Sequence, residues 1–266
     1  MFGEDYFDKF DPQIYLQMYY TDNSDPFRLY LMKELHKFYQ SYNSTASKLK
    51  ILDIGTGPVI AYTISAAPYA SQIILSEYTE ANHKALLQWL KNDPKAHNWT
   101  PFFRYVVVDL EGNSEEDVTV RAELVRNVIK AVVPCDVNSN PPIPTQYVDQ
   151  YDIITAFLVL VAACATEKVY VAALVRLHAL LRPGGKIVLY TSEMNEPPTQ
   201  PSFSYPVGSH NFFDLQLPRG SITVLLEQAG FCDVKIIPLT RQGLQVAEDQ
   251  YPPYVGFNFV TALKMN

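Results

Sequence analysis

The sequence predicts an α/β fold in which a mostly parallel sheet is covered by helices on both faces. Strand-like apolar runs, as at 49–54, 72–76 and 186–192, alternate with helical segments. Strands joined through helices pair in parallel, and nearly continuous apolar runs indicate burial of both sheet faces. The length of 266 residues and a hydrophobic content of 48% fit one sizeable core, and no linker is visible. We therefore expect a single domain over residues 1–266.

Local patterns justify the elements in chain order. Asp25 followed by Pro26 is typical of a helix start, so helices are expected at 12–20 and 25–40, within an N-terminal cover of residues 1–48. The remaining helices are expected at about 58–68, 80–91, 115–132, 166–181 and 219–229. The strands are expected at 49–54, 72–76, 102–108, 151–159, 186–192, 231–238 and 255–263.

Capping residues support several of these boundaries. Thr79 and Thr166 are suited to cap the helices at 80–91 and 166–181. Gly230 is suited to end the helix at 219–229. The last two strands have no helix between them, which predicts an antiparallel hairpin at one edge of a seven-stranded sheet. The segment from Asn195 to Pro218 is too polar for core and too aromatic for a plain linker. We expect residues 193–218 to form a substrate-side lid with some structure of its own.

Composition excludes several classes of protein. The net charge of −7, the pI near 5.2 and the lack of a Lys/Arg run argue against nucleic acid as a partner and favour a small molecule. The longest apolar stretch, 153–165, is too short to span a bilayer, which takes about 20 residues. The acidic N-terminus lacks a signal pattern, so we expect a cytoplasmic protein, and we expect a monomer. Three scattered cysteines predict free thiols and no metal site.

A glycine turn marks the first ligand-site candidate. The strand at 49–54 leads into Asp53-Ile54-Gly55-Thr56-Gly57-Pro58, and Glu77 ends the next strand, 24 positions after Asp53. Glycines without a Cβ let backbone approach a ligand, and an acid at the tip of the second strand can accept hydrogen bonds from ribose hydroxyls. Because Pro58 follows and no third glycine does, a nicotinamide-dinucleotide oxidoreductase is disfavoured.

Other strand ends nominate further residues. Asp53 would lie near the cationic end of a ligand or fix the glycine turn, whereas turn chemistry accounts for Asp109. Asp136 could accept a proton from an adenine amino group while the Val137 N–H serves a ring nitrogen, or Asp136 could form a turn; the residues leave both open. Phe157 and Leu158 end a further strand.

Tyr15, Tyr19 and Tyr20 lie at helical spacing, which is most often packing. Over a ligand, such tyrosines would offer stacking faces, cation–π attraction for a sulfonium and hydroxyls for a carboxylate. Among the five histidines only His210, within the lid, stays a candidate.

Seven blocks in order over nearly the whole chain resemble one family. They are Asp11 to Tyr20, Asp53 to Pro58, Ser76 to Thr79, Trp89-Leu90, Asp109 to Asn113, Cys135-Asp136-Val137 and Arg182 to Gly185. Together they resemble the nicotinamide, phenylethanolamine and indolethylamine N-methyltransferases, so the chain is expected to have the Rossmann-like class I methyltransferase fold. The resemblance implies S-adenosylmethionine as the methyl donor and S-adenosylhomocysteine as the product.

The resemblance also implies which residues contact the cofactor. They are Tyr15, Tyr20, Gly55, Thr56, Glu77, Asn82, Asp136 and Val137, with Phe157 beside the site. The cofactor-binding candidates further include Asp53, Gly57, Tyr62 and Tyr78. Two positions depart from the family. Glu77 replaces the usual Asp, and Tyr62 replaces a tyrosine usually found one position earlier, where this chain has Ala61.

The acceptor side departs further from the family. Thr191 stands where nicotinamide-type members have Asp, and Val161 stands where phenylethanolamine-type members have Glu. Tyr205, Gly208 and Asp214 match family substrate-site positions. The substrate-binding candidates are Tyr19, Leu158, Thr191, Ser192, Tyr205 and Asp214, the catalytic candidates are Tyr15, Glu193 and Asp214, and Asp249 could also partner a cationic amine.

The leading hypothesis is therefore an N-methyltransferase acting on a small aromatic or heterocyclic amine. A sulfonium is an activated donor, so the protein must mainly align the amine lone pair and exclude water. An alkylamine must first lose a proton, for which a carboxylate would help, whereas a pyridine nitrogen need not. The alternatives are an O, S or lipid head-group acceptor on the same fold, or a member that binds the cofactor without turnover.

Overall fold

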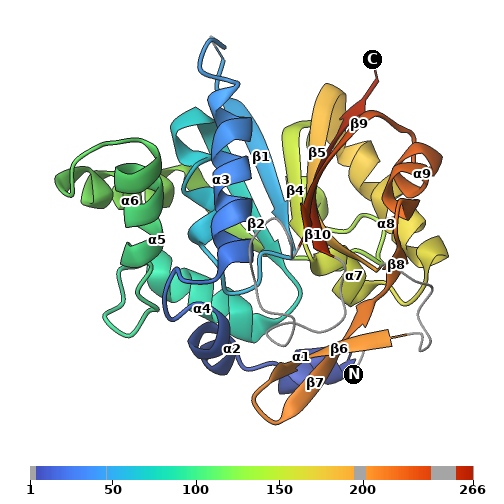
Figure 1. The fold of residues 1–266 in the computed structure, drawn as a ribbon, viewed down its shortest axis with the longest axis horizontal. Coiled ribbons are helices and arrows are strands. Elements are labelled where there is room, and N and C mark those ends of the chain that lie inside the picture. The colour runs from blue at the N-terminus through green and yellow to red at the C-terminus, as the bar shows by residue number, and fades with distance from the viewer. Residues whose placement is uncertain (1–3, 46, 195–201, 241–255, 266) are drawn as a thin grey trace.

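The computed structural model describes residues 4–45, 47–194, 202–240 and 256–265 (Figure 1). Its α-helices are α1 (Glu4–Lys9), α2 (Pro12–Tyr19), α3 (Pro26–Gln40), α4 (Glu80–Leu90), α5 (Thr100–Arg104), α6 (Glu116–Val128), α7 (Val159–Ala163), α8 (Glu167–Leu180) and α9 (Ser221–Gln228). Its strands are β1 (Leu49–Ile54), β2 (Ala70–Glu77), β3 (Ile129–Pro134), β4 (Tyr151–Phe157), β5 (Leu181–Met194), β6 (Ser202–Val207), β7 (His210–Leu215), β8 (Leu217–Pro218), β9 (Phe231–Thr240) and β10 (Gly256–Lys264).

The main sheet has the strand order β3-β2-β1-β4-β5-β10-β9, with the short β8 paired to β5. Strands β1 to β5 pair in parallel, whereas β10 pairs antiparallel to both β5 and β9. The predicted fold class is thereby confirmed, including the antiparallel arrangement at one edge. Strand order reverses between β1 and β4, the point where ligands of open α/β sheets bind at the carboxyl ends.

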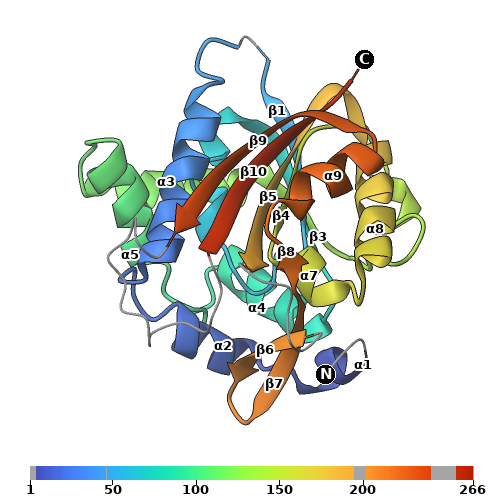
Figure 2. The ribbon, with the colours of Figure 1, turned by 45° about the vertical axis from the view of Figure 1, so that its right-hand side comes forward.

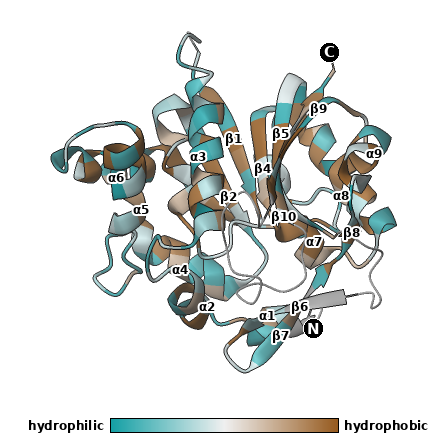
Figure 3. Cartoon of the chain, viewed as in Figure 1, coloured by the Kyte–Doolittle hydropathy of each residue, from teal (hydrophilic) through white to brown (hydrophobic). Residues whose placement is uncertain are grey.

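Two hydrophobic clusters pack on opposite faces of this sheet. Ile51 belongs to the cluster with α3 to α6, and its neighbour Leu52 belongs to the cluster with α7, α8 and α9. Successive side chains of a strand point to opposite faces, so the near-continuous apolar strands follow from burial on both sides. Figure 3 shows brown bands along the central strands and teal on the outer sides of the helices. That the chain is one domain stays a prediction.

Thr79 and Thr166 cap α4 and α8 as predicted, since their hydroxyls accept from the backbone N–H groups of Asn82 and Val169. Helix α2 is likewise capped by Asp11, whose carboxylate accepts from two backbone N–H groups. The short helix α1 was not predicted, because one and a half turns carry too little periodicity to be recognised.

The helix expected at 58–68 is wrong. The segment forms two short 3₁₀ turns, η1 (Ala61–Thr63) and η2 (Ala67–Tyr69). Prolines at 58 and 68 interrupt backbone hydrogen bonding, and β-branched residues between them disfavour a longer helix.

The strand expected at 102–108 is also wrong. Residues 100–110 form α5 and a π-helical segment, η3 (Tyr105–Leu110). The fully buried side chains are Phe102, Phe103, Val106 and Val107. A spacing of four positions between these pairs is the helical period, which outweighed the strand propensity of their residue types.

The helix expected at 115–132 ends early, because α6 stops at Val128 and β3 follows at once. β3 is therefore the third strand along the chain, in place of the strand expected at 102–108, and it lies at one edge of the sheet beside β2. Likewise the strand expected at 151–159 ends at Phe157, where Leu158 has a positive φ of 59° and starts α7.

The N-terminal helices and the β6–β7 hairpin form a cover at one end of the sheet. Figures 1 and 2 both show α1, α2 and the hairpin grouped at this end of the molecule. The Tyr19 hydroxyl donates to the Pro206 carbonyl over 2.8 Å, and Phe10 and Phe212 pack with ring centroids 5.5 Å apart. Lid residues 195–201 lie outside the described residues. In the part of the chain that the structure describes, no helix is long and apolar enough to cross a membrane.

Gly55→Ala is expected to destabilise the fold more than Gly57→Ala. Both glycines have a φ of 61°, which costs an alanine about 1 kcal/mol or more. A Cβ at Gly55 would also lie 2.1 Å from Val159 Cγ2, whereas one at Gly57 meets no atom within 4 Å. Overpacking adds about 1–3 kcal/mol, so urea denaturation should show a clearly larger loss for Gly55→Ala. Equal losses for the two variants would contradict the packing of this turn against α7.

Candidate functional site

Glu77 is the centre of the candidate cofactor site. Its carboxylate is 3% exposed and accepts hydrogen bonds from the Gly57 N–H over 2.9 Å, the Thr79 N–H over 3.1 Å and the Asn82 amide over 2.9 Å. A buried carboxylate is tolerated when several donors satisfy it. Glu77 therefore joins the glycine turn after β1 to the start of α4, and it holds both at the carboxyl end of β2.

Asn82 provides a test of whether this place fits a hydroxylated ligand. Its side-chain amide nitrogen donates to Glu77, which leaves the carbonyl oxygen as the remaining acceptor. That buried oxygen has no hydrogen-bond partner among the described residues. An orphaned acceptor beside an acid suits a ribose hydroxyl, so the residues present fit the nucleoside part of S-adenosylmethionine.

Asp53 lies at the end of β1 and is buried. It accepts a hydrogen bond from the Thr155 hydroxyl of β4. Burial raises the pKa of Asp53 to about 6, and the charge of Glu77 also raises it, while bonds from Thr155 and Thr56 lower it. The glycine turn donates its Gly57 N–H to Glu77 and its Thr56 hydroxyl to Asp53, so both acids help to hold the turn.

A chain of aromatic rings runs from the cover to the sheet. Tyr15 lies 5.2 Å from Tyr19 and 5.7 Å from Tyr20, measured between ring centroids. The hydroxyls of Tyr20 and Tyr62 share a hydrogen bond of 2.9 Å, and the Tyr62 ring lies 5.2 Å from Phe157. The structure thus brings three tyrosines of the N-terminal cover, the displaced Tyr62 and the end of β4 into one aromatic cluster.

Asp136 follows β3, and its own turn occupies both carboxylate oxygens. One oxygen accepts from the Asn138 N–H over 2.9 Å and the other from the Ser139 hydroxyl over 2.7 Å. This geometry favours turn formation, while each oxygen keeps a second lone pair for a ligand amino group. Val137 buries its side chain in the core, and Tyr78 is an exposed neighbour whose ring contacts Phe7 of α1.

The candidates for the acceptor side lie on β5 and on the cover. Thr191, Ser192 and Asp214 are buried. Burial raises the pKa of Tyr170 of α8, which a hydrogen bond with Thr191 lowers and the charge of Asp214 raises further. Burial raises the pKa of Tyr205 well above its usual range, and the charges of Asp214 and Glu77 add to the rise. Tyr205 is therefore near enough to both Asp214 and Glu77 to feel an electrostatic effect of each carboxylate.

Two expected catalytic candidates lie in different surroundings. The Glu193 carboxylate accepts a hydrogen bond from the Gly220 N–H over 3.0 Å, directly before α9. It therefore links the end of β5 to the start of α9. Tyr15 instead packs among the cover rings, and burial raises its pKa well above the usual range. Asp249 falls outside the described residues, and Asp109 is exposed in η3 instead of ending a strand.

The sequence reasoning missed several contributors to the site. Tyr6 of α1 forms a hydrogen bond with Tyr205, and the nearby charge of Glu77 adds to the rise in the pKa of Tyr6. The Thr155 hydroxyl donates a hydrogen bond to Asp53. Arg28 of α3 lies over the Tyr20 ring. For Thr155, the alternation of β4 places it at the same depth as Asp53, with which it is paired in register, and this signal could have found it.

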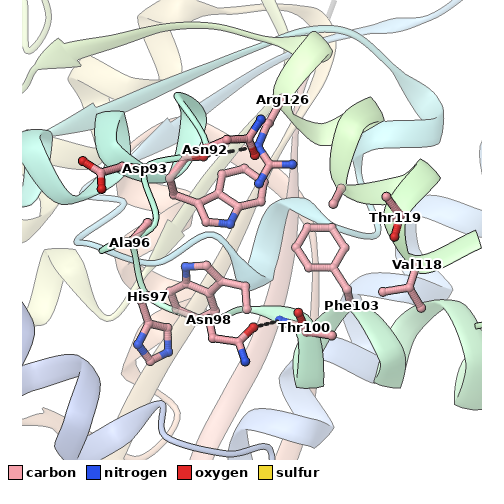
Figure 4. Close-up of a pocket in the computed structure, with 13 residues that line it drawn as sticks. Asn92, Asp93, Ala96, His97, Asn98, Thr100, Phe103, Val118, Thr119 and Arg126 are labelled. Carbon is pink, nitrogen blue, oxygen red and sulfur yellow. Dashed lines mark hydrogen bonds between the residues drawn. The ribbon is translucent and has the colours of Figure 1, made fainter.

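A cavity of about 380 Å³ lies elsewhere, between α4, α5 and α6 (Figure 4). Its lining includes Asn92, His97, Phe103 and Arg126, and none of the expected site residues. The His97 ring nitrogen lies 2.8 Å from the Tyr20 carbonyl oxygen, so one wall of the cavity borders the aromatic chain. Among the described residues no group of acidic, histidine or cysteine side chains could hold a metal ion.

Comparisons with known proteins decide the family. A sequence profile described as the NNMT/PNMT/TEMT family matches residues 1–263. The chain belongs to this family. It is 32% identical to indolethylamine N-methyltransferase of Mus musculus over 266 residues, which cover 98% of this chain and 96% of that protein. It is 31% identical to nicotinamide N-methyltransferase of Homo sapiens over 231 residues, which cover 85% and 83%. Family membership confirms the resemblance and the prediction of an S-adenosylmethionine-dependent methyltransferase.

Solved structures agree on the fold. The glycopeptide N-methyltransferase MtfA, complexed with S-adenosylmethionine, matches with a TM-score of 0.55 at 13% identity over 93% of this chain and 96% of that one. The magnesium protoporphyrin IX methyltransferase of Synechocystis PCC 6803 matches with a TM-score of 0.57 at 12% identity over 98% and 94%. At such low identity the likeness shows the fold alone.

Glu77→Gln is expected to weaken S-adenosylhomocysteine binding by about tenfold or more, because one charged acceptor beside the orphaned Asn82 oxygen is lost. Glu77→Ala should in addition lower the free energy of unfolding by about 2–4 kcal/mol, since buried N–H groups lose their acceptor. Calorimetric titration and urea denaturation measure the two effects. The control is Glu80→Gln, an exposed acid three positions later at the start of α4, which should change neither. Unchanged affinity in Glu77→Gln would remove Glu77 from the site.

The affinity for S-adenosylhomocysteine is expected to fall as the pH drops below 6. With a pKa of about 6, the Asp53 carboxyl is charged at pH 7.5 and mostly neutral at pH 5, where a ligand ammonium loses its partner. The loss at pH 5 should be about tenfold if only the charged form binds. Calorimetry at both pH values measures it, and Asp53→Asn should remove most of the pH dependence. A flat profile in the unsubstituted protein would contradict a role of Asp53 at the ammonium.

The same pKa shift fixes the sign of a stability effect. Folded Asp53 binds a proton more readily than unfolded Asp53, because burial raises its pKa from 3.8 to about 6. Its contribution to the free energy of unfolding should therefore increase as the pH falls from 6 toward 4, opposite to a salt-bridged carboxylate. Asp53→Asn should lack this contribution in denaturation curves recorded across that range.

Proposed function

We propose that this protein transfers a methyl group from S-adenosylmethionine to a small aromatic or heterocyclic amine. The observation that carries the proposal is the Glu77 centre: a buried acid, bonded to the glycine turn and to Asn82, beside an orphaned acceptor. It lies at the carboxyl end of β2, next to the point where strand order reverses. Family membership and the relatives named as indolethylamine and nicotinamide N-methyltransferases support the amine as acceptor.

The residues of the site divide the work of holding the cofactor. Glu77 and Asn82 would bind the ribose, the turn of Gly55, Thr56 and Gly57 would lie along the ligand, and Asp136 and Val137 would meet the adenine. The remaining contacts are proposed for Asp53, Tyr15, Tyr20, Tyr62, Tyr78 and Phe157. When bound, the cofactor supplies a methyl group already activated by the sulfonium.

The chain's own task is then alignment and exclusion of water. The cover of α1, α2 and the β6–β7 hairpin packs through Phe10, Phe212 and the Tyr19–Pro206 bond, so it can shield the reacting atoms. Holding an amine in line with the methyl group contributes several kcal/mol without a strong base. We propose Tyr19, Leu158, Thr191, Ser192, Tyr205 and Asp214 as the acceptor wall.

Asp214 is proposed to partner the acceptor's nitrogen. It is 9% exposed, and its charge acts on Tyr205, which also feels Glu77. A buried carboxylate on the acceptor side favours an amine that is cationic in solution, and it can receive the proton that the amine loses. We retain Tyr15 and Glu193 as catalytic candidates, although the Glu193 bond to Gly220 makes it the weaker one.

A methyl-transfer screen tests the function. Labelled S-adenosylmethionine is incubated with the protein and with nicotinamide, quinolines, tryptamine and phenylethanolamines, and the methylated product is identified by mass spectrometry. Turnover of any of these amines would support the proposal. Binding of S-adenosylhomocysteine with turnover only of hydroxyl, thiol or lipid head-group acceptors, or with none, would point to the alternatives on the same fold.

Asp214→Asn is expected to raise the KM of a cationic amine by about tenfold, because a charged partner contributes roughly 1.5 kcal/mol more than a neutral one. The affinity for S-adenosylhomocysteine should not change. Initial-rate kinetics measure the first quantity and calorimetry the second. The matched control is Asp109→Asn, an exposed Asp of η3, which should leave both unchanged. An unaltered KM in Asp214→Asn would exclude Asp214 from the acceptor wall.

The compartment and the assembly state rest on composition. The acidic charge and the lack of a Lys/Arg run support a protein without a nucleic-acid partner. We propose a monomeric, cytoplasmic enzyme, and size-exclusion chromatography with light scattering together with cell fractionation tests both statements.

A further inference from the structure

Arg28 is a buried cation behind the candidate cofactor tyrosines. It lies on the first turn of α3, is 7% exposed, and its guanidinium carbon sits 4.2 Å from the centroid of the Tyr20 ring and 5.8 Å from that of Phe102. Burial lowers the pKa of Arg28, but its contacts with Tyr20, Tyr62 and Asp25 raise it above the ordinary value. The guanidinium is therefore charged, and a buried charge is costly unless hydrogen bonds and an opposite charge compensate it.

The charge of Arg28 reaches three tyrosines of the site. It acts electrostatically on Tyr15, Tyr20 and Tyr62. Burial raises the pKa of Tyr62 and Tyr15, and the charge of Arg28 works against that rise in both. A nearby cation makes a phenol hydroxyl a stronger hydrogen-bond donor. One of the hydroxyls of Tyr20 and Tyr62 donates to the other over 2.9 Å. The accepting hydroxyl therefore keeps its own proton to donate to a ligand, with a cation behind the pair.

The charges of the candidate site are otherwise negative. Asp53 and Glu77 are both buried acids, whereas the proposed cofactor ends in an amino acid that carries an ammonium and a carboxylate. The ammonium can pair with Asp53. A carboxylate near two buried acids is disfavoured unless a positive charge or strong donors compensate it.

We propose that Arg28 is a positioning residue that recognises the cofactor's carboxylate through the hydroxyls of Tyr20 and Tyr62. The inference rests on the proposed function. It makes Arg28 the positive charge that compensates the carboxylate at the amino acid end of the ligand. Arg28 acts through the tyrosines, because its guanidinium lies over the Tyr20 ring and its terminal nitrogens face the loop before α3.

The pairing of Arg28 with Asp25 does not cancel this role. The guanidinium donates to the Asp25 carboxylate over 3.2 Å and to the Asp22 carbonyl over 3.1 Å. The Asp25 side chain is 22% exposed against 7% for Arg28, so solvent screens the negative partner more than the positive one. Asp25 also caps α3, and both contacts fix the orientation of the guanidinium.

The test measures the coupling between Arg28 and the ligand's carboxylate. Calorimetry gives the affinity of the full chain for S-adenosylhomocysteine and for its decarboxylated analogue, which keeps the adenosine, the sulfur and the amine. In the unsubstituted protein, loss of the carboxylate should weaken binding by about tenfold or more. In Arg28→Met the two ligands should bind within about twofold of each other, and Arg28→Lys should restore most of the difference.

Arg126→Met is the matched control. Arg126 also packs on an aromatic ring, 4.1 Å from the centroid of Trp89, but it lines the cavity between α4 and α6. Its loss should leave the ratio of the two affinities as it is in the unsubstituted protein. A ratio that changes in Arg126→Met as it does in Arg28→Met would overturn the proposal, since any arginine packed on an aromatic ring would then act alike.

Other outcomes separate the inference from the proposed function. If the unsubstituted protein binds neither ligand, the proposed function fails. If it binds both equally, the carboxylate is not recognised and the inference fails alone, without any variant. If Arg28→Met weakens both ligands by the same factor, Arg28 only supports the fold of the cover and the inference fails. Should Arg28→Met not fold, Arg28→Gln replaces it with the same expectation.

Discussion

The site depends on one buried carboxylate, that of Glu77. Four donors can hold it: the Gly57 and Thr79 backbone N–H groups, the Thr79 hydroxyl and the Asn82 amide. The Glu77 carbonyl also accepts from the Cys135 N–H, which ties β2 to the segment that carries Asp136. Gly55 and Gly57 have no side chains to position the turn, so its backbone is held by acceptors on β2, namely the Ser76 carbonyl for the Thr56 N–H and the Glu77 carboxylate for the Gly57 N–H. A single acid therefore aligns three ligand-facing segments at the carboxyl edge of the sheet.

The other constraint is closure of this edge. Leu158 has a positive φ at the end of β4, and backbone strain of this kind persists only where the surroundings enforce it. Above this edge the cover supplies rings from α1, α2 and the β6–β7 hairpin, among them Tyr6, Phe10 and Phe212. Exclusion of water strengthens the few charges within, namely Glu77, Asp53 and Asp214 on the acidic side and Arg28 on the basic side. The proposed chemistry needs such a dry, aligned space more than it needs a strong base.

The sequence predicted those features of the fold and of the candidate site that depend on residues close together in the chain, and it failed where contacts between distant segments decide the structure. The caps Thr79 and Thr166 were predicted correctly, and Asp53, Gly55 and Glu77 could be chosen as site candidates, because cap, turn and strand-end chemistry are local. The segments 58–68, 102–108 and 129–132 were assigned wrongly, because prolines and burial against distant elements outweighed local propensity. Arg28 could not be recognised as part of the site, since only the fold brings α3 against Tyr20 and Tyr62. Asp249 and the lid residues 195–201 lie outside the described residues.

The most direct measurement of the central claim is a crystal structure of the protein with S-adenosylhomocysteine. The account predicts that a ribose hydroxyl lies within hydrogen-bond distance of the Glu77 carboxylate and that the Asn82 oxygen gains a partner. It also predicts that the Gly57 N–H stays bonded to Glu77, because the carboxylate can serve the turn and the ligand together. A ligand bound elsewhere, or a ribose turned away from Glu77 with the Asn82 oxygen still orphaned, would contradict the account.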